Sequence, residues 1–333
     1  MNDASHIYNL TMKLFGPEPE PAFETPEELA FGWGRAWGCD NSVGKIRVIL
    51  VHRPGDELNR IDRSKRIEAI GSYGDIADGW YWQSETIPDF DLLRAQHDAY
   101  VAALREEDIE VVTLDGVAEG RLKSVYTRDP VIMVKGGAVI GRLAVRARRG
   151  EEAVITRTLG KLGVPILRTV HGDGLLEGGS FSWLNATTAA IGRSVRVNET
   201  GCRHLEQVLS EQGVDLVRVD LTGYNIHLDG ALMMLDTDLA LIDPDLLSYS
   251  FIEKLSELGI ETIELGPDDD PWIINCLTIA PRRLLMPEGA SQATLDRLAE
   301  RGVTWRIVPY DLVQLNGGGL HCSTQPLIRD PVR

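Results

Sequence analysis

The sequence predicts an α/β protein built from five similar units. A helix-like stretch, a small or acidic breaker residue and a short apolar run recur along the chain, for example as LSEQGVDLVRV and LSELGIETIEL. The breakers stand at intervals of roughly 50 residues and are Asp108, Gly163, Gly213, Gly259 and Gly302. Potentially reactive side chains recur at a similar interval and are Asp129, Glu177, His227, Asn275 and Cys322. Because a unit of this length cannot bury its own apolar face, we expect the units to pack together around a common centre.

Residues 1–44 differ from the rest of the chain. Prolines at 17, 19, 21 and 26 stand among acids, and the aromatic, glycine-rich piece FGWGRAWGCD follows. We expect an irregular arm that packs Trp33 and Trp37 onto the body or covers the site. The regular pattern begins with the strand-like KIRVILVHRPG, and IPDFDLLRAQHDAYVAALREED then has helical spacing with Asp89 as its cap.

Each later unit reads strand, turn, strand, helix, strand. The third unit shows the order most clearly, as FSWL, NATT, AAIGRSV, CRHLEQVLSEQG and VDLVRVDL. This alternation predicts the α/β class. Five such units suggest a propeller-like ring, with helices outside and short strands lining a central site. Because the linkers are short, we expect residues 45–333 to form a single catalytic domain.

Composition and charge narrow the classes of function. The chain has 333 residues, a formal net charge of −16 and a pI near 4.9. This charge opposes nonspecific nucleic-acid binding and suits a cationic ligand. The apolar runs are too short for a secretory signal or a membrane span, so we expect a cytoplasmic protein without membrane contact. Four single cysteines without a C-x-x-C pair disfavour a disulfide framework or a zinc knuckle.

Candidate reactive groups concentrate around a thiol and an imidazole. Cys322 follows the glycine run 317–319, whose backbone can lie close to a ligand. His227 and Asp229 share one face of an extended segment, an arrangement that suits a general base beside a carboxylate. Taken alone, a single cysteine is more often a core residue and a His-x-Asp pair is more often structural.

Two further carboxylates complete the set. Glu177 precedes Gly-Gly and Asp129 precedes Pro130, and each alone would be an ordinary turn acid. Together with Asp229 they could hold a planar cation while the thiolate of Cys322 attacks its central carbon, and guanidinium fits this best. The spacings typical of metal and nucleotide sites are absent, so we expect neither metal nor cofactor. Asn275 receives no catalytic role.

Seven motifs resemble the guanidino-group modifying, or pentein, superfamily. This superfamily includes arginine deiminases, dimethylarginine dimethylaminohydrolases, agmatine deiminases and amidinotransferases. The matching motifs, in family order, are VILVHRPGDEL, YTRDP, ARRGE, LEGG, IGRSVRVN, HLD and GGGLHCST. The resemblance implies a five-bladed, pseudo-symmetric α/β propeller, which agrees with the repeat spacing.

The resemblance also implies roles for individual residues. Cys322 is the nucleophile, and His227 protonates the departing amine and later activates water. Glu177 contacts the guanidinium and supports His227, while Asp129 and Asp229 bond guanidinium nitrogens.

The resemblance implies a carboxylate clamp and leaves the exact reaction open. In the arginine-specific members, arginines of the ARR and IGxxxR segments grip the substrate carboxylate; the matching positions are Arg148 or Arg149, and Arg196. Asn316 stands where arginine deiminases usually have arginine. The GGG-apolar-His-Cys tail is more similar to amidinotransferases or agmatine deiminases, whereas Glu-Gly-Gly is typical of the hydrolases.

We therefore expect a cofactor-independent hydrolase of a small guanidino compound, arginine or a derivative, acting through a covalent amidino (thiouronium) intermediate on Cys322. One alternative is an amidinotransferase, in which an amine acceptor replaces water. Another is a noncatalytic propeller that binds a partner. Related enzymes are often dimers or larger, which leaves a homo-oligomer open.

Overall fold

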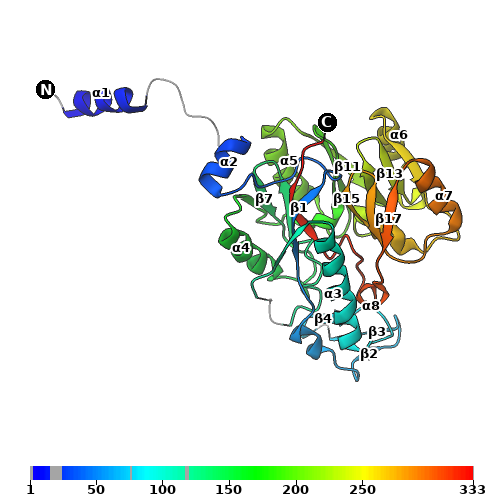
Figure 1. Ribbon diagram of the computed structural model, residues 1–333. Coiled ribbons are helices and arrows are strands. Elements are labelled where there is room, and N and C mark those ends of the chain that lie inside the picture. The colour runs from blue at the N-terminus through cyan, green and yellow to red at the C-terminus, as the bar shows by residue number, and fades with distance from the viewer. Residues whose placement is uncertain (1–2, 16–24, 76, 117–119, 333) are drawn as a thin grey trace.

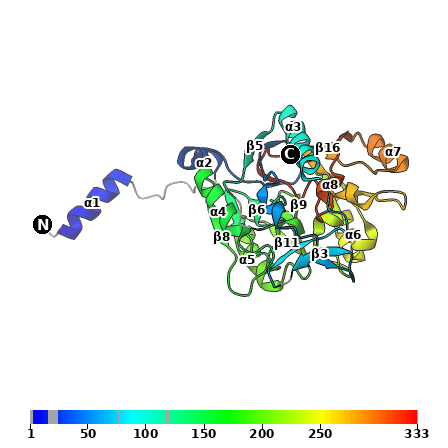
Figure 2. The ribbon, with the colours of Figure 1, turned by 90° about the horizontal axis from the view of Figure 1, so that it is seen from below.

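The secondary structure is mixed α/β. The computed structural model describes residues 3–15, 25–75, 77–116 and 120–332. Within these ranges the strands form six three-stranded sheets, and five of them share one pattern of connections. In each of the five, the middle strand pairs antiparallel with one neighbour and, after a helix, parallel with the other. Figures 1 and 2 show the sheets gathered in one body with helices on its outside.

The first sheet joins the two ends of the described body. It comprises β18 (Gln325–Arg329), β1 (Ile46–Val51) and β5 (Glu110–Thr113), with α3 (Phe90–Glu106) leading to β5. The second comprises β6 (Val131–Val134), β7 (Gly137–Ile140) and β8 (Ile166–Thr169), with α4 (Glu151–Leu162). The third comprises β9 (Phe181–Asn185), β10 (Thr188–Arg193) and β11 (Asp215–Asp220), with α5 (Glu199–Glu211).

The remaining sheets complete the body. The fourth comprises β12 (Leu232–Asp236), β13 (Leu239–Ile242) and β14 (Glu261–Glu264), with α6 (Tyr249–Glu257). The fifth comprises β15 (Leu277–Ala280), β16 (Arg283–Met286) and β17 (Thr304–Ile307), with α7 (Gln292–Glu300). A small sheet of β2 (Arg66–Ile67), β3 (Ser72–Asp75) and β4 (Trp80–Trp82) is inserted between β1 and α3. Short helices are η1 (Asp56–Arg60), η2 (Gly178–Ser180), η3 (Leu228–Gly230), η4 (Pro244–Leu246), η5 (Pro271–Asn275) and α8 (Asp311–Gln314).

Helix boundaries follow from local sequence signals. The Asp89 side chain accepts hydrogen bonds from the N–H groups of Asp91 and Leu92, so the cap predicted for α3 is confirmed. The five breaker residues all have positive φ, at 57° for Asp108, 82° for Gly163, 70° for Gly213, 74° for Gly259 and 69° for Gly302. This left-handed conformation ends each helix and turns the chain toward the parallel strand that follows.

Each helix buries an apolar stripe against its own sheet. In the third unit, Leu205 and Leu209 of α5 lie one turn apart and pack in one cluster with Ile191 of β10. Similar clusters accompany the other units. Burial of these stripes drives the helices onto the sheets, so the strand ends and the loops before them are held in fixed positions.

In each of the five sheets we call the antiparallel neighbour of the middle strand the first strand; these are β18, β6, β9, β12 and β15. The first strands contact one another from sheet to sheet. β18 contacts β6, β9 contacts β12, and β12 contacts β15. Trp183 Nε1 of β9 donates a hydrogen bond of 3.4 Å to the Met133 carbonyl of β6. Arg329 Nη2 of β18 donates one of 3.0 Å to the Thr278 carbonyl of β15. The series of contacts therefore returns to the sheet in which it began.

The N-terminal segment differs from the irregular arm expected for residues 1–44. It contains α1 (Asp3–Phe15) and α2 (Pro26–Trp33), and α1 lies apart from the body in both views (Figures 1 and 2). Thr25 caps α2 by accepting from the Glu28 N–H, and Pro26 occupies its first turn. Trp37 is buried, whereas Trp33 is 43% exposed. The prolines at 17, 19 and 21 lie outside the described residues.

Among the residues that the structure describes, no helix is both long enough and apolar enough to cross a membrane.

Candidate active site

The five reactive positions noted in the sequence occupy equivalent places in the fold. Asp129 lies two residues before the first strand of its sheet, and Glu177, His227, Asn275 and Cys322 lie in the segments that lead into theirs. All five side chains are buried. The helix-strand units that repeat along the chain therefore also repeat the segment that precedes the first strand of each sheet.

Hydrogen bonds connect the loops of the second, third and fourth sheets. The Gly178 N–H donates to the Asp129 carbonyl at 2.8 Å. The Ser180 hydroxyl donates to the Ile226 carbonyl at 3.4 Å, directly before His227. These bonds hold Glu177 between the other two loops.

Asn275 continues the connection to Cys322. Its Nδ2 donates to the Asp229 carbonyl at 3.1 Å, and its Oδ1 accepts from the Cys322 N–H at 3.2 Å. The Arg128 N–H then donates to the Cys322 carbonyl at 3.1 Å and so returns to the loop of Asp129. Asn275 thus bridges two loops, although the sequence analysis gave it no role beyond its matching position in the repeat.

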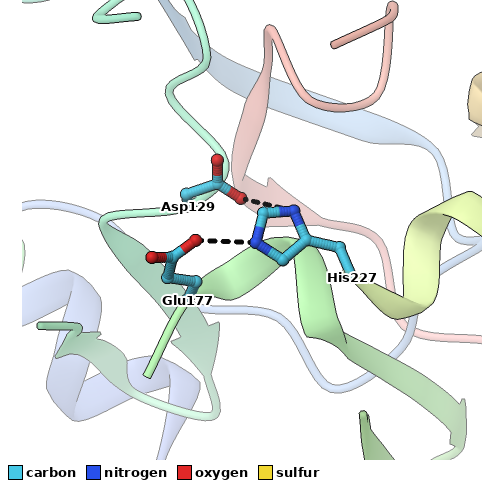
Figure 3. Close-up of side chains that lie close together, drawn as sticks. All are labelled: Asp129, Glu177 and His227. Carbon is cyan, nitrogen blue, oxygen red and sulfur yellow. Dashed lines mark hydrogen bonds and ion pairs between the residues drawn. The ribbon is translucent and has the colours of Figure 1, made fainter. Parts of the chain in front are cut away.

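His227 lies between two carboxylates (Figure 3). Its Nε2 is 2.7 Å from Glu177 Oε2, and its Nδ1 is 3.6 Å from Asp129 Oδ1. Burial lowers the pKa of His227, but the charge of Asp129 and the hydrogen bond to Glu177 outweigh it and raise the pKa to about 9. The imidazole is therefore a cation at neutral pH, ready to donate a proton.

Cys322 has an acidic neighbour. Its Sγ lies 3.4 Å from Asp229 Oδ2, and the side chain is buried. Burial and the negative charges of Asp229 and Asp129 raise the pKa of the thiol well above its usual value. Without a bound cation the sulfur is therefore protonated at neutral pH.

His321 is a site residue that the sequence reasoning missed. Its Nδ1 lies 2.8 Å from Asp229 Oδ2. Burial and the charge of Arg128 lower the pKa of His321 to about 4, so it is a neutral hydrogen-bond donor to that carboxylate. The only signal was its place beside Cys322 in GGGLHC. Both Asp229 and His321 also line a cavity with Arg128 and Arg329.

Arg148, one of the arginines expected to grip a substrate carboxylate, is bonded inside the site. Its Nη1 donates to Asp129 Oδ2, and its Nη2 lies 2.7 Å from Glu151 Oε2. Nη2 also donates to the Tyr126 and Lys123 carbonyls, at 3.0 and 3.4 Å. The side chain is only 3% exposed. These bonds leave it little capacity for a ligand and orient Asp129.

Arg149 and Arg196 differ in position. Arg149 donates to the carbonyls of Leu143 and Ala144, and the structure shows it in no bond to the reactive groups. Arg196 Nη1 donates to Glu177 Oε2 at 3.1 Å. Within the described residues, the side-chain bonds of Arg196 use Nη1 alone. Its other nitrogens therefore remain as donors.

The glycines of the LEGG and GGG motifs allow close packing of the site. A Cβ on Gly179 would lie 2.7 Å from Asp129 Oδ1 and 2.9 Å from His227 Nδ1. A Cβ on Gly319 would lie 2.7 Å from Asn275 Oδ1. Any larger side chain at these positions would displace a reactive group.

The acids and imidazole could in principle supply metal ligands. Asp129, Glu177 and His227 each offer one ligand atom within 4.8 Å of the others. A metal, however, requires the neutral imidazole, and the pKa of about 9 keeps His227 protonated at neutral pH. Asp129 is also paired with Arg148. The cluster therefore suits an organic cation that can accompany the imidazolium better than a metal ion.

Over 241 residues the chain is 28% identical to the N(G),N(G)-dimethylarginine dimethylaminohydrolase of Pseudomonas aeruginosa, with 71% of this chain and 89% of the relative covered. A solved Pseudomonas aeruginosa enzyme of this name, complexed with citrulline, superposes with a TM-score of 0.66 at 22% identity, covering 84% of this chain and 98% of that one.

Amidinotransferases share this fold. An amidinotransferase of saxitoxin biosynthesis from Microseira wollei superposes with a TM-score of 0.72 at 12% identity, covering 89% of this chain and 98% of that chain. The sequence pattern of one family, described as N,N dimethylarginine dimethylhydrolase, eukaryotic, matches residues 89–329. The chain belongs to this family, within the guanidino-modifying pentein superfamily.

Proposed function

We propose that the site hydrolyses a C–N bond of a small guanidino compound, arginine or a derivative, with Cys322 as its nucleophile. Its family makes the chain a cysteine-dependent hydrolase acting on such bonds. The observation that carries the assignment is the meeting of one thiol, one imidazolium and three carboxylates on hydrogen-bonded loops from different sheets.

Substrate binding prepares the nucleophile. The guanidinium of the substrate bonds to Asp129 and Asp229, and Glu177 contacts it while holding His227. The positive charge of the substrate offsets the two carboxylates that raise the pKa of Cys322. The thiol then releases its proton to solvent, so the reactive thiolate forms only when substrate is present.

The reaction proceeds in two stages. The thiolate adds to the central guanidinium carbon, and His227 gives its proton to the departing nitrogen as that C–N bond breaks. This leaves an amidino group on sulfur. Water then attacks the same carbon while His227 takes back a proton, and the C–S bond breaks to release the urea product and the thiolate.

The carboxylate of the substrate is assigned to Arg196. Its Nε and Nη2 are not used by other described side chains, whereas Arg148 is committed to Asp129 and Glu151. We therefore favour Arg148 as a positioning residue and assign Arg149 no direct contact.

We also propose that the five sheets are the blades of a closed α/β propeller, with residues 45–333 as the catalytic domain. The contacts from β18 through β6, β9, β12 and β15 back to β18 support this arrangement. In it, the loops before the first strands lie around one axis, which explains why one reactive residue comes from each unit.

The test combines a variant with covalent labelling. Cys322→Ser should abolish turnover of guanidino substrates and labelling by a haloacetamidine reagent, read by mass spectrometry. Cys202→Ala, in α5, should retain both. Product analysis of arginine with and without glycine separates urea-type products from guanidinoacetate. Full activity of Cys322→Ser would disprove the nucleophile, and guanidinoacetate as the main product would favour amidinotransfer.

A further inference from the structure

The proposed reaction leaves unexplained a cavity between the first strands of the sheets. Its walls include residues of β6, β9, β12 and β18, so four of the five sheets border it. The cavity offers about 40 Å³ of room to the centres of water molecules. One water needs roughly 10–15 Å³ on that measure. The space is therefore large enough for a few waters or one small ion.

Two buried arginines border this cavity, and each is only 9% exposed. Arg128 Nε donates to the His321 carbonyl at 3.3 Å, and its Nη2 is buried without a hydrogen-bond partner among the described residues. Arg329 donates from Nη1 to the Gly44 carbonyl at 2.7 Å and from Nη2 to the Thr278 carbonyl at 3.0 Å. These acceptors are neutral, so the hydrogen bonds position the two guanidinium groups without balancing their charge.

Both guanidinium groups are cations at neutral pH. Burial and the charge of Arg128 lower the pKa of Arg329 to about 9, which still leaves it protonated. Within the ranges that the structure describes, neither arginine forms an ion pair with a carboxylate; their side chains bond only to carbonyls. Two like charges that share a desolvated space repel each other and have lost part of their hydration, which is unfavourable unless an opposite charge is present.

The other ionisable groups on the described wall supply only one negative charge. Burial raises the pKa of Cys39 to about 12, so it is a neutral thiol. His321 is neutral as well, with its pKa at about 4. Asp229 is a carboxylate whose Oδ2 contacts both His321 and Cys322. Two positive charges against one negative charge leave a single positive charge uncompensated.

A monovalent anion fits this environment better than water alone. Water can accept a hydrogen bond from Arg128 Nη2, but it cannot balance a charge. An anion does both, because it accepts charge-assisted hydrogen bonds from guanidinium nitrogens. We propose that the cavity binds one small monovalent anion of halide size, held by Arg128 and Arg329. The proposal is independent of the proposed reaction, since Cys322, Glu177 and His227 are not among the described residues that line the cavity.

Thermal unfolding of the full, chloride-free chain tests for binding. Sodium chloride is compared with sodium gluconate at equal ionic strength, because gluconate has the same charge and is too large for the cavity. The unfolding midpoint should rise in chloride alone, by about 1–3 °C for each tenfold increase once the site begins to fill. The formal net charge of −16 does not attract anions to the surface in general, so this rise reports a local site. Equal midpoints in the two salts at every concentration would overturn the proposal.

Bromide locates the anion, because it is similar to chloride in size and charge and gives an anomalous X-ray signal. Crystals of the unmodified protein grown in sodium bromide should show an anomalous peak inside the cavity, beside Arg128 and Arg329. Peaks at the surface alone would mean an adventitious ion only, and a cavity that holds nothing but water would mean no site. Either result would overturn the proposal, even if chloride raised the unfolding midpoint.

Gln325→Glu builds the missing charge into the wall. Gln325 lines the cavity and is 4% exposed, and glutamate has nearly the same shape as glutamine. The variant should unfold at the same temperature in chloride and in gluconate, because its own carboxylate replaces the anion. Gln207→Glu, at an exposed position of α5, is the matched control and should keep the chloride dependence of the unmodified protein.

The outcome for Gln325→Glu is decisive where the variant folds. A folded Gln325→Glu protein with the full chloride dependence would contradict an anion held in this cavity. If the variant does not fold, the chloride titration and the bromide crystals of the unmodified protein decide the question by themselves.

Discussion

At the scale of single residues, the charge on His227 links catalysis to stability. The carboxylates of Asp129 and Glu177 hold its pKa at about 9, above the ordinary value of 6.5. A folded-state pKa raised in this way adds stability that is fully present below pH 6.5 and is lost as the pH rises through about 9. The same proton is the one the leaving nitrogen receives in the proposed mechanism.

Glu177→Gln tests this linkage. The variant should bring the pKa of His227 down toward its ordinary value, because the amide removes the hydrogen-bonded negative charge. The loss of unfolding free energy between pH 6.5 and 9, on the order of 2–4 kcal/mol, should become shallower. NMR titration of the ring and urea unfolding at several pH values measure both effects. A His227 pKa near 6.5 in the unmodified protein would contradict the assignment.

Gly179 tests how closely the reactive groups must pack. Gly179→Ala places a methyl group against Asp129 and His227, so kcat/KM should fall by at least about 100-fold. Gly160→Ala is the matched control, since Gly160 lies in α4 with open space around its Cβ position. That change should leave activity intact and raise stability by about 0.5–1 kcal/mol. Equal activity of the two variants would show that the site tolerates displacement.

The residues of the candidate site could be predicted from the sequence, but several of their hydrogen-bond partners could not. The equal phase of Asp129, Glu177, His227 and Cys322 indicated a common centre because each precedes the same strand of its unit. The bond from Arg148 to Asp129 depends on how a buried turn folds back, and no spacing in the sequence encodes it. The bond from Lys123 to the Asn316 carbonyl likewise has no signal in the sequence.

At the scale of the element, the helices α3 to α7 of the five units end in the same way. Four of the five breakers are glycines with positive φ, and Asp108 has a φ of 57° in the same place. A side chain in the left-handed region is strained, although Asp tolerates it better than most residues. Such local signals made the five helix-strand units predictable. The helices α1 and α2 were not predicted, because the prolines among acids in residues 17–26 favoured an irregular arm.

Asp108→Gly should therefore stabilise the protein by about 0.5–1 kcal/mol, since glycine adopts this φ without steric strain. The reciprocal change, Gly213→Ala after α5, should destabilise it by about 1 kcal/mol, because its φ is 70° with nothing within 4 Å of the Cβ position. Midpoints of urea unfolding at constant m-value measure both changes. The idea fails if the two variants shift the midpoint in the same direction.

At the scale of the whole molecule, the C-terminal strand completes the sheet that the first body strand begins. β18 pairs with β1, and Leu327 within it is fully buried. Arg329 joins the same strand to β15. The pairing of strands from opposite ends of the chain could not be read from local patterns, since it depends on closure of the series of units. Terminal strands usually fray, whereas this one is held from two sides.

Closure predicts that β18 opens only when the whole body unfolds. Native-state hydrogen exchange should give the β18 amides the same opening free energy as those of β10, and the amides of α1, which lies apart from the body, should exchange rapidly. Leu327→Ala should lower the values for β18 and β10 together, by about 2–4 kcal/mol, because the cavity forms in a strand that both neighbouring sheets require. Deletion of residues 1–15 should change neither value. If Leu327→Ala released β18 alone while β10 kept its protection, the five sheets would open independently, and the closed propeller would have to be abandoned.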